Sequence, residues 1–324
     1  MKLRRSERMV VISNYLINNP YQLISLNTFA EKYETAKSSI SEDIGIVKKA
    51  FEEAGIGQVE TVTGASGGVL FTPSISSEEA KSIAEGLCQR LSESDRILPG
   101  GYIYLSDLLS TPSILKKVGR IIAKAFSGQQ IDAVMTVATK GVPLANAVAE
   151  ILNVPFVIVR RDLKITEGST VSVNYASGSS DRIEKMFLSK RSLKPNSNVL
   201  IVDDFLKGGG TISGMVSLLS EFDCHLVGVA VFADNKQIKR NLFVDYKSLL
   251  TVSKIDVKSA SGTAVSISGV LGVMFDRDAL GVTNLDKRVT TNYNAKAEFF
   301  NNYFKFDAGY FNDTNENFVV FFVA

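Results

Sequence analysis

A stretch at residues 199–211 combines residue types that can bind a phosphorylated sugar. Residues 199–202 are apolar and predict a buried strand, and two adjacent carboxylates, Asp203 and Asp204, follow them. A glycine loop comes next and is expected to open a helix, where backbone N–H groups can close around a phosphate. Ligands of open α/β sheets bind at the carboxyl ends of the strands. Because carboxylates repel phosphate, Asp203 and Asp204 fit ribose hydroxyls, or a Mg²⁺ ion held with a pyrophosphate. The alternative to a ligand site is an ordinary strand, turn and helix with acidic residues at the start of the turn.

The elements that would position this stretch alternate between strand and helix from residue 129 to about residue 256. The predicted strands are residues 133–137, 156–159, 170–175, 197–202 and 226–232, and the predicted helices are residues 143–152 and 211–222. Continuous Val and Ile runs with intervening helices indicate a parallel sheet covered on both faces. Residues 75–128 are mostly helical and are interpreted as a lead-in to this sheet. The predicted fold class is therefore α/β.

The first 74 residues predict three helices followed by a hairpin. Apolar residues recur at helical spacing in residues 5–18, 26–33 and about 39–51, and two strands at 58–63 and 68–72 flank a glycine turn. Three helices and a hairpin in this order describe a winged helix. In such a unit the second helix of the helix-turn-helix pair enters the DNA major groove.

Two groups of residues in this unit are predicted to contact DNA. They are Lys37, Ser38, Ser39 and Ser41 at the start of the third helix, and Lys2, Arg4, Arg5 and Arg8, expected as a positive patch at the other end of the unit. Hydroxyls, lysines and a helix N-terminus all donate to phosphates. Residues 1–74 hold eight Lys or Arg against eight Asp or Glu, so the unit is not basic overall. A winged helix used for protein contact or dimerisation is the alternative.

Several classes of protein are excluded by composition. The chain has two cysteines, Cys88 and Cys224, and one histidine, His225, which exclude a Cys/His zinc cluster and make a disulfide framework implausible. No metal site formed by the protein and no catalytic residue is predicted. No apolar run is long enough for a membrane span, and the N-terminus lacks the pattern of a signal peptide. The protein is expected to be cytoplasmic, without a membrane partner.

Residues 199–211 resemble the 13-residue motif with which type I phosphoribosyltransferases bind phosphoribosyl pyrophosphate (PRPP). The resemblance implies that PRPP is bound, with Mg²⁺ as an accompanying ion. Residues 134–141 are similar to the pyrophosphate loop of that family, and residues 160–169 lie where the family has a flexible loop. The PRPP-binding residues implied in these stretches are Asp203, Asp204, Phe205, Lys207, Gly208, Gly209, Gly210, Thr211, Thr139, Lys140, Gly141 and Arg160.

The motif departs from that of the enzymes at Lys207 and Gly208. Active relatives usually have a small residue followed by threonine there, and some use an acidic residue as the catalytic base. A charged lysine can bind phosphate but does not readily accept a proton. No segment for a nucleobase pocket is evident. Binding of PRPP without catalysis is therefore expected, and a catalytic purine phosphoribosyltransferase with an appended module is the alternative.

Residues 1 to about 256 resemble the PurR-type purine operon regulators of Gram-positive bacteria. The similar stretches are residues 36–43, 98–102, 166–172 and 202–205, and the second of them adds Tyr102 to the expected PRPP-binding residues. The resemblance implies a homodimer that binds operator DNA upstream of purine biosynthesis genes, with PRPP altering the affinity. The sign of regulation, activator or repressor, and the operator sequence stay open. The predicted domains are a winged helix at 1–74 and a phosphoribosyltransferase-like sensor at 75–257.

Residues 258–324 form a third, atypical segment rich in Phe, Tyr and Asn. Residues 272–276 and 310–313 are similar to the end of tailed-phage major capsid proteins. A fusion that replaces the regulator's own C-terminus would explain this composition, and an extra regulatory domain is the alternative. A phage structural protein that carries bacterial sequence is a further hypothesis for the whole chain.

Overall fold

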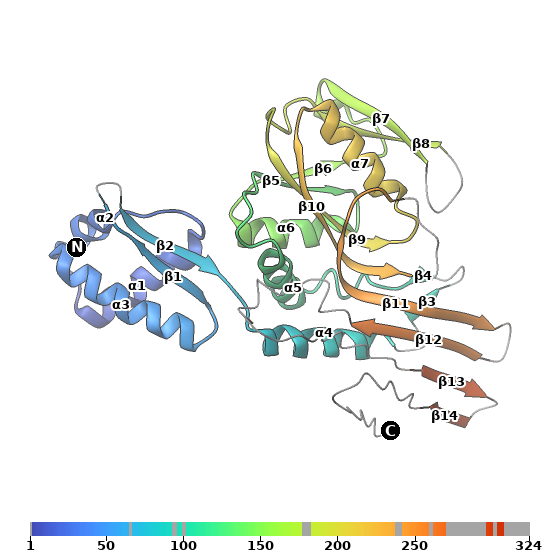
Figure 1. The fold of residues 1–324 in the computed structure, drawn as a ribbon, viewed down its shortest axis with the longest axis horizontal. Helices are drawn as coiled ribbons and strands as arrows, with labels where there is room; N and C mark the ends of the chain where they lie inside the picture. Colours follow the sequence, from blue (N-terminus) through green and yellow to red (C-terminus); the bar gives the residue numbers. More distant parts are fainter. Residues whose placement is uncertain are drawn as a thin grey trace.

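A computed structural model describes most of the chain as two units joined at residues 74–76 (Figure 1). The described residues are 2–64, 67–92, 96–98, 102–176, 183–236, 242–258, 262–269, 296–300 and 303–307. For residues 97, 98 and 102, and for those after residue 252, only the backbone elements are described. Among the described residues no helix is long and apolar enough to cross a membrane.

The N-terminal unit is a three-helix cluster with a two-stranded wing, as its sequence pattern predicts. Its elements are α1 (Arg5–Asn18), α2 (Leu26–Lys32), α3 (Lys37–Glu53), β1 (Gly57–Val62) and β2 (Gly68–Pro73). The Ser25 hydroxyl accepts a hydrogen bond from the Asn27 backbone N–H and so caps α2. Gly55 ends α3 with φ of +63°, a conformation that glycine adopts without steric cost. Apolar residues that recur every three or four positions, such as Ile40, Ile44 and Val47, are buried in a core of the unit's own.

The second unit is built on a six-stranded sheet with the order β12-β11-β10-β9-β5-β6. Five strands are parallel, and β12 pairs antiparallel with β11 at one edge. The strands are β5 (Ala133–Val137), β6 (Phe156–Val159), β9 (Asn198–Leu206), β10 (His225–Asn235), β11 (Lys247–Lys258) and β12 (Gly262–Gly269). A two-stranded piece, β3 (Ile97–Leu98) with β4 (Tyr102–Ile103), precedes the sheet in sequence.

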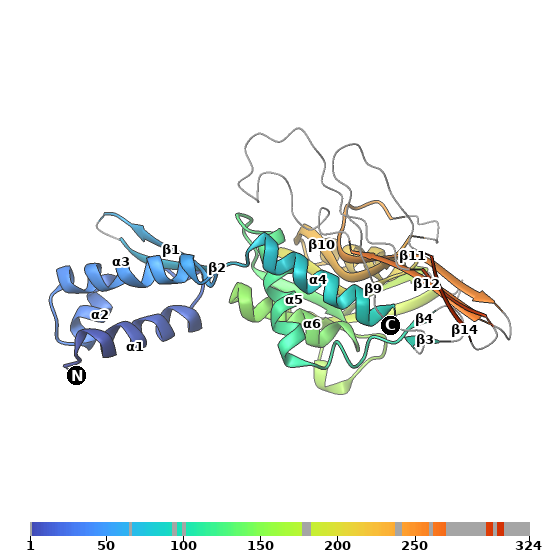
Figure 2. The same ribbon diagram turned by 90° about the horizontal axis from the view of Figure 1, so that it is seen from below.

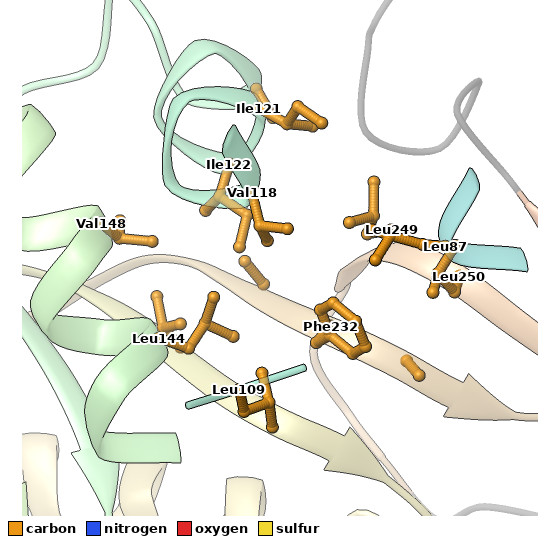
Figure 3. Packing of buried hydrophobic residues seen from close by; sticks show 14 of the residues in the cluster. Leu87, Leu109, Val118, Ile121, Ile122, Leu144, Val148, Phe232, Leu249 and Leu250 are labelled. Atoms are coloured by element: carbon orange, nitrogen blue, oxygen red, sulfur yellow. The ribbon is translucent and has the colours of Figure 1, made fainter. Parts of the chain in front are cut away.

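Helices cover both faces of this sheet, and each face has its own apolar cluster (Figures 1 and 2). One face packs against α4 (Ser77–Leu91), α5 (Pro112–Ala125) and α6 (Gly141–Leu152), and the other packs against α7 (Gly210–Glu221). Residues of β9 alternate between the two, with Leu200 and Val202 on the first face and Val199 and Ile201 on the second. Figure 3 shows Phe232 of β10 among side chains of α5 and α6 in the first cluster. Burial on both faces explains why these strands are continuous apolar runs.

The strand predicted at residues 170–175 is not part of the parallel sheet. Residues 170–175 do form a strand, β7 (Thr170–Ala176), but it pairs antiparallel with β8 (Ile183–Ser189) as a separate two-stranded ribbon. The physical reason is its alternation of polar and apolar residues: Val171, Val173 and Tyr175 pack against the α7-side cluster, while the residues between them are polar. A strand of this kind has one apolar face, unlike the strands of a doubly covered sheet.

The sheet continues past residue 257, where the sequence predicts a domain boundary. Strand β12 follows that boundary and is hydrogen-bonded to β11. A further hairpin consists of β13 (Lys296–Phe300) and β14 (Tyr303–Asp307). The two stretches similar to phage capsid proteins, residues 272–276 and 310–313, lie outside the described residues. The fusion hypothesis therefore stays a prediction.

Candidate functional site

The two carboxylates of the predicted sugar site lie near the carboxyl end of β9. The strand runs through Asp203 and Asp204 to Leu206, four residues past its predicted end, because β10 pairs with it as far as Leu206. Asp203 is 4% exposed, whereas Asp204 is partly exposed. The Asp204 backbone N–H donates to Asp203 Oδ1 at 3.0 Å. Burial raises the pKa of Asp203 well above its ordinary value, and the neighbouring charge of Asp204 raises it further.

The predicted pyrophosphate loop reaches Asp203 through Gly141, the first residue of α6. A Cβ atom at Gly141 would lie 2.4 Å from Thr136 Oγ1 and 3.0 Å from Asp203 Oδ1, so only glycine fits there. The Thr136 hydroxyl is buried and has no hydrogen-bond partner among the described residues. Thr139 and Lys140 are exposed beside it, directly before α6. The sequence-predicted loop and the carboxylates are thus brought together.

The glycine loop after β9 opens α7, as predicted. Gly209 has φ of +85° and precedes the first residue of α7, and no side chain caps this helix start. The backbone N–H groups of the first turn therefore have no side-chain cap, and the positive end of the helix dipole lies at this glycine loop. The motif residues Lys207, Gly208, Gly210 and Thr211 line this loop and are all partly exposed. Phe205 instead packs against the apolar cluster under α5 and α6.

The charged segment after β6 has two adjacent arginines, and each lies beside a glutamate. Arg160, a predicted ligand contact, donates from Nε to Glu167 Oε1 at 2.8 Å. Arg161 is exposed, lies 3.8 Å from Glu184 of β8, and its charge lowers the pKa of Asp203 against the stronger effects of burial and Asp204. The Tyr175 hydroxyl donates to the same Glu184 carboxylate at 2.5 Å, and burial raises the pKa of Tyr175 to about 12. Both arginines are thus paired with glutamates, and the role of Arg160 in binding PRPP stays a prediction.

Sequence reasoning missed Thr136, Tyr175 and Glu184 as neighbours of the site. The last two lie on the β7–β8 ribbon, and the pairing of that ribbon carries no local signal. Tyr102 begins β4 and pairs with Leu98, and its predicted role stays a prediction. Groups of three or more His, Cys, Asp or Glu side chains that could hold a metal ion are absent from the described part of the chain.

The predicted DNA-reading residues of α3 are exposed together at its start. Lys37, Ser38 and Ser41 are exposed and Ser39 is partly so, while Ile40 between them is fully buried. The residue before the helix, Ala36, offers no side-chain cap. The first N–H groups of α3 are thus open to a phosphate, beside hydroxyls that can also donate.

The positive patch at the start of α1 differs from the prediction in two respects: where it lies and which residues are exposed in it. It lies beside α3, not at the other end of the unit, because Arg5 and Arg8 form ion pairs with Asp43 of α3. Arg8 is 8% exposed, with its Nε 2.5 Å from Asp43 Oδ2, so a DNA contact from Arg8 is contradicted by its burial. Lys2 and Arg4 are exposed, and Arg5 is about half exposed while it pairs with Asp43 and Glu42.

Comparison with known families matches both units. Residues 4–73 match the family described as bacterial purine repressor, N-terminal, and residues 105–265 match the phosphoribosyl transferase domain family. The predicted fold class, a winged helix followed by a phosphoribosyltransferase-like parallel-sheet domain, is confirmed by these matches and by the sheet topology.

Comparison with individual proteins extends the similarity over both units at once. The probable purine biosynthesis transcriptional regulator PurR of Streptococcus pneumoniae is 75% identical over 279 residues, which cover 86% of this chain and 100% of that relative. The chain belongs to the PurR family of purine biosynthesis transcriptional regulators.

Other PurR family members differ in the sign of regulation that their names state. The purine biosynthesis transcriptional activator of Lactococcus lactis is 56% identical over 259 residues, 80% of this chain and 96% of that relative. The purine biosynthesis transcriptional repressor of Bacillus subtilis is 54% identical over 261 residues, 81% of this chain and 92% of that relative. Similar identity to an activator and a repressor leaves the sign for this chain open.

Proposed function

We propose that this protein binds operator DNA of purine biosynthesis genes through its winged helix, and that PRPP binding in the second unit changes its affinity for that DNA. The observation that carries the proposal is the pair Asp203 and Asp204 between the α6 loop and the open N-terminus of α7. Carboxylates accept hydrogen bonds from ribose hydroxyls, while uncapped helix starts bind phosphate. Both halves of PRPP thus have complementary groups within one site.

The DNA-binding half of the proposal rests on the exposed start of α3. Lys37 and three serines surround uncapped backbone N–H groups, and Lys2 and Arg4 add charge from the neighbouring start of α1. We further propose a homodimer, since two-fold symmetric regulators match paired half-sites on DNA. Mg²⁺ would enter with the pyrophosphate and be held in part by Asp203 and Asp204, whose oxygen ligands suit it.

The protein is proposed to bind PRPP without converting it. Transfer of the phosphoribosyl group needs a held nucleobase and a group that accepts its proton. Lys207 stands at the motif position where some enzymes carry a carboxylate base, so the motif has no carboxylate there to accept a proton.

The test is a titration of labelled duplex DNA from the upstream region of a purine biosynthesis gene, followed by fluorescence anisotropy. The DNA affinity is measured with and without PRPP and Mg²⁺, and a duplex of scrambled sequence is the control. We expect PRPP to change the specific affinity by about 5-fold or more, as is usual for coupled sites. Equal affinities with and without PRPP would contradict the proposal.

A further inference from the structure

Helix α6 connects the proposed PRPP site with the winged-helix unit. Its first residue, Gly141, touches Asp203 and Thr136, as described above. At its other end Asn153 adopts a left-handed conformation, with φ of +56°, and caps the helix. The Asn153 side chain donates from Nδ2 to the carbonyl oxygen of Pro20 at 3.0 Å. Pro20 is buried in the turn between α1 and α2, and the next residue, Tyr21, is exposed and donates its N–H to the Phe71 carbonyl oxygen of β2.

Helix α5 makes a second connection, at the end of the helix proposed to read DNA. Arg120 Nη2 donates to the Gly55 carbonyl oxygen at 2.8 Å, and Gly55 terminates α3. The same guanidinium donates to the Ser74 carbonyl oxygen and pairs with Glu79 at 3.0 Å. One turn later on the same face, Lys124 Nζ donates to the Ile75 carbonyl oxygen at 2.6 Å. A cation at the C-terminus of α3 is also favoured by the helix dipole.

Helices α5 and α6 are packed closely against each other. Gly119, next to Arg120, lies against α6, since a Cβ there would be 2.9 Å from the Ala147 carbonyl oxygen. Val118 and Ile122 of α5 and Leu144 and Val148 of α6 are buried together in the cluster of Figure 3. Such interiors are close-packed and transmit small displacements instead of absorbing them.

The winged-helix core is a separate apolar cluster from the clusters of the second unit. Its residues end at Phe71, and the cluster under α4 and α5 begins at Ile75. Units that do not share an apolar core are expected to move relative to one another. The polar contacts of Arg120 and Asn153 are therefore well placed to set the orientation of the winged helix.

We propose that α6 and α5 carry the PRPP signal to the winged helix, with Asn153 and Arg120 as the positioning residues that couple the two sites. A ligand that shifts Gly141 shifts α6, and through Pro20 and Gly55 it turns the helix α3 on the DNA. This inference rests on the proposed function, because it assumes that PRPP binds beside Gly141. It adds which residues transmit the response.

The test separates binding from coupling in two variants. Asn153→Gly keeps the left-handed backbone and removes the hydrogen bond to Pro20, and Arg120→Gln removes the charge and shortens the reach to Gly55. The matched controls are Asn196→Gly, another exposed asparagine with positive φ, and Lys117→Gln, an exposed cation of α5. PRPP affinity is measured by calorimetry, and DNA affinity by anisotropy with and without PRPP.

We expect both variants to bind PRPP within about 2-fold of the unmodified protein while the PRPP effect on DNA affinity falls toward 1-fold. By linkage, the effect of DNA on PRPP affinity must fall by the same factor. The controls should keep the full effect. Variants that keep the full effect overturn the coupling and leave the proposed function standing, whereas an unmodified protein that binds no PRPP contradicts both.

A second measurement covers the case in which Arg120→Gln unfolds the protein. Amide hydrogen exchange in the unmodified protein, with and without PRPP, reports on the backbone at residues 21–24, which follow Pro20, and at residues 55–56. A PRPP-dependent change in exchange is expected in both segments and should disappear in Asn153→Gly at residues 21–24. Exchange that is unaffected by bound PRPP in both segments would overturn the coupling.

Discussion

At the residue scale, the two adjacent carboxylates of β9 differ in burial, which the sequence pattern does not predict. Their place in the motif predicts that both lie near a strand end, but their difference in burial depends on Gly141, which lies against Asp203, and on the pairing with β10. Asp203 is almost fully buried and its pKa is raised, whereas Asp204 is partly exposed. A buried carboxylate of this kind destabilises the folded protein when it is charged.

The change Asp203→Asn is therefore expected to stabilise the protein while removing its response to PRPP. A raised folded-state pKa means that stability is lost as pH rises from the unfolded-state value through the folded-state value. The stabilisation should be largest near pH 8, about 1 kcal/mol, and shrink as pH falls toward 5. Thermal unfolding at several pH values measures it. A variant that is less stable than the unmodified protein at pH 8 would refute this account of Asp203.

Arg8 and Lys37 are both cations of the winged helix, but their surroundings predict that replacing the first lowers stability and replacing the second weakens DNA binding. Arg8→Ala should lower the stability of the winged-helix unit by about 3 kcal/mol, because Asp43 is fully buried and loses a partner. Lys37→Ala should leave stability unchanged and reduce the slope of log affinity against log salt by about one. Calorimetry and DNA titrations at several salt concentrations measure the two effects. A reduced salt slope with unchanged stability in Arg8→Ala would restore Arg8 as a phosphate contact.

At the element scale, local periodicity predicted the α-helices and seven strands, β1, β2, β5, β6, β7, β9 and β10, but it could not supply long-range partners. Helix α1 and strands β5 and β6 have the bounds that their apolar spacing indicates. Strands β8, β11 and β12 were not predicted, and β7 was assigned to the wrong sheet, since strand pairing depends on tertiary contacts.

The contact between α6 and β9 gives the element-scale prediction. Gly141→Ala would place a methyl group against Thr136 and Asp203, so we expect a loss of about 1–3 kcal/mol of stability together with weaker PRPP binding. Gly86→Ala in α4 is the control, since no atom lies within 4 Å of its Cβ position. That change should stabilise the protein by about 0.5–1 kcal/mol. Tight PRPP binding by Gly141→Ala would show that this close approach does not shape the site.

At the scale of the whole molecule, the sequence predicted a winged-helix unit, a sheet unit and an atypical third segment, but not how the first two units are joined. Arg120 and Asn153 donate to main-chain carbonyl oxygens of Gly55, Ser74 and Pro20. Every residue has a main-chain carbonyl oxygen, so a sequence pattern cannot show which of them accepts a hydrogen bond from Arg120 or Asn153. Geometry alone reveals the connection.

The absence of turnover is the prediction that distinguishes a sensor from an enzyme. Purified protein with PRPP and Mg²⁺ should form no nucleotide from adenine, guanine, hypoxanthine or xanthine, because Lys207 offers no base to accept the purine proton. Chromatography of the reaction mixture, with an active phosphoribosyltransferase as the positive control, detects any product. Nucleotide formation that is lost when Asp203 and Asp204 are both replaced would favour the catalytic alternative.

The central claim is that Asp203 and Asp204 bind PRPP, and that this binding changes the affinity of the winged helix for DNA. Its most direct test is DNA titration of the double variant Asp203→Ala, Asp204→Ala, with and without PRPP, beside the unmodified protein. The account predicts that without PRPP the two proteins bind operator DNA with equal affinity, because the winged helix has its own core. With PRPP, only the unmodified protein should change its affinity. An equal PRPP effect in the double variant would contradict the claim.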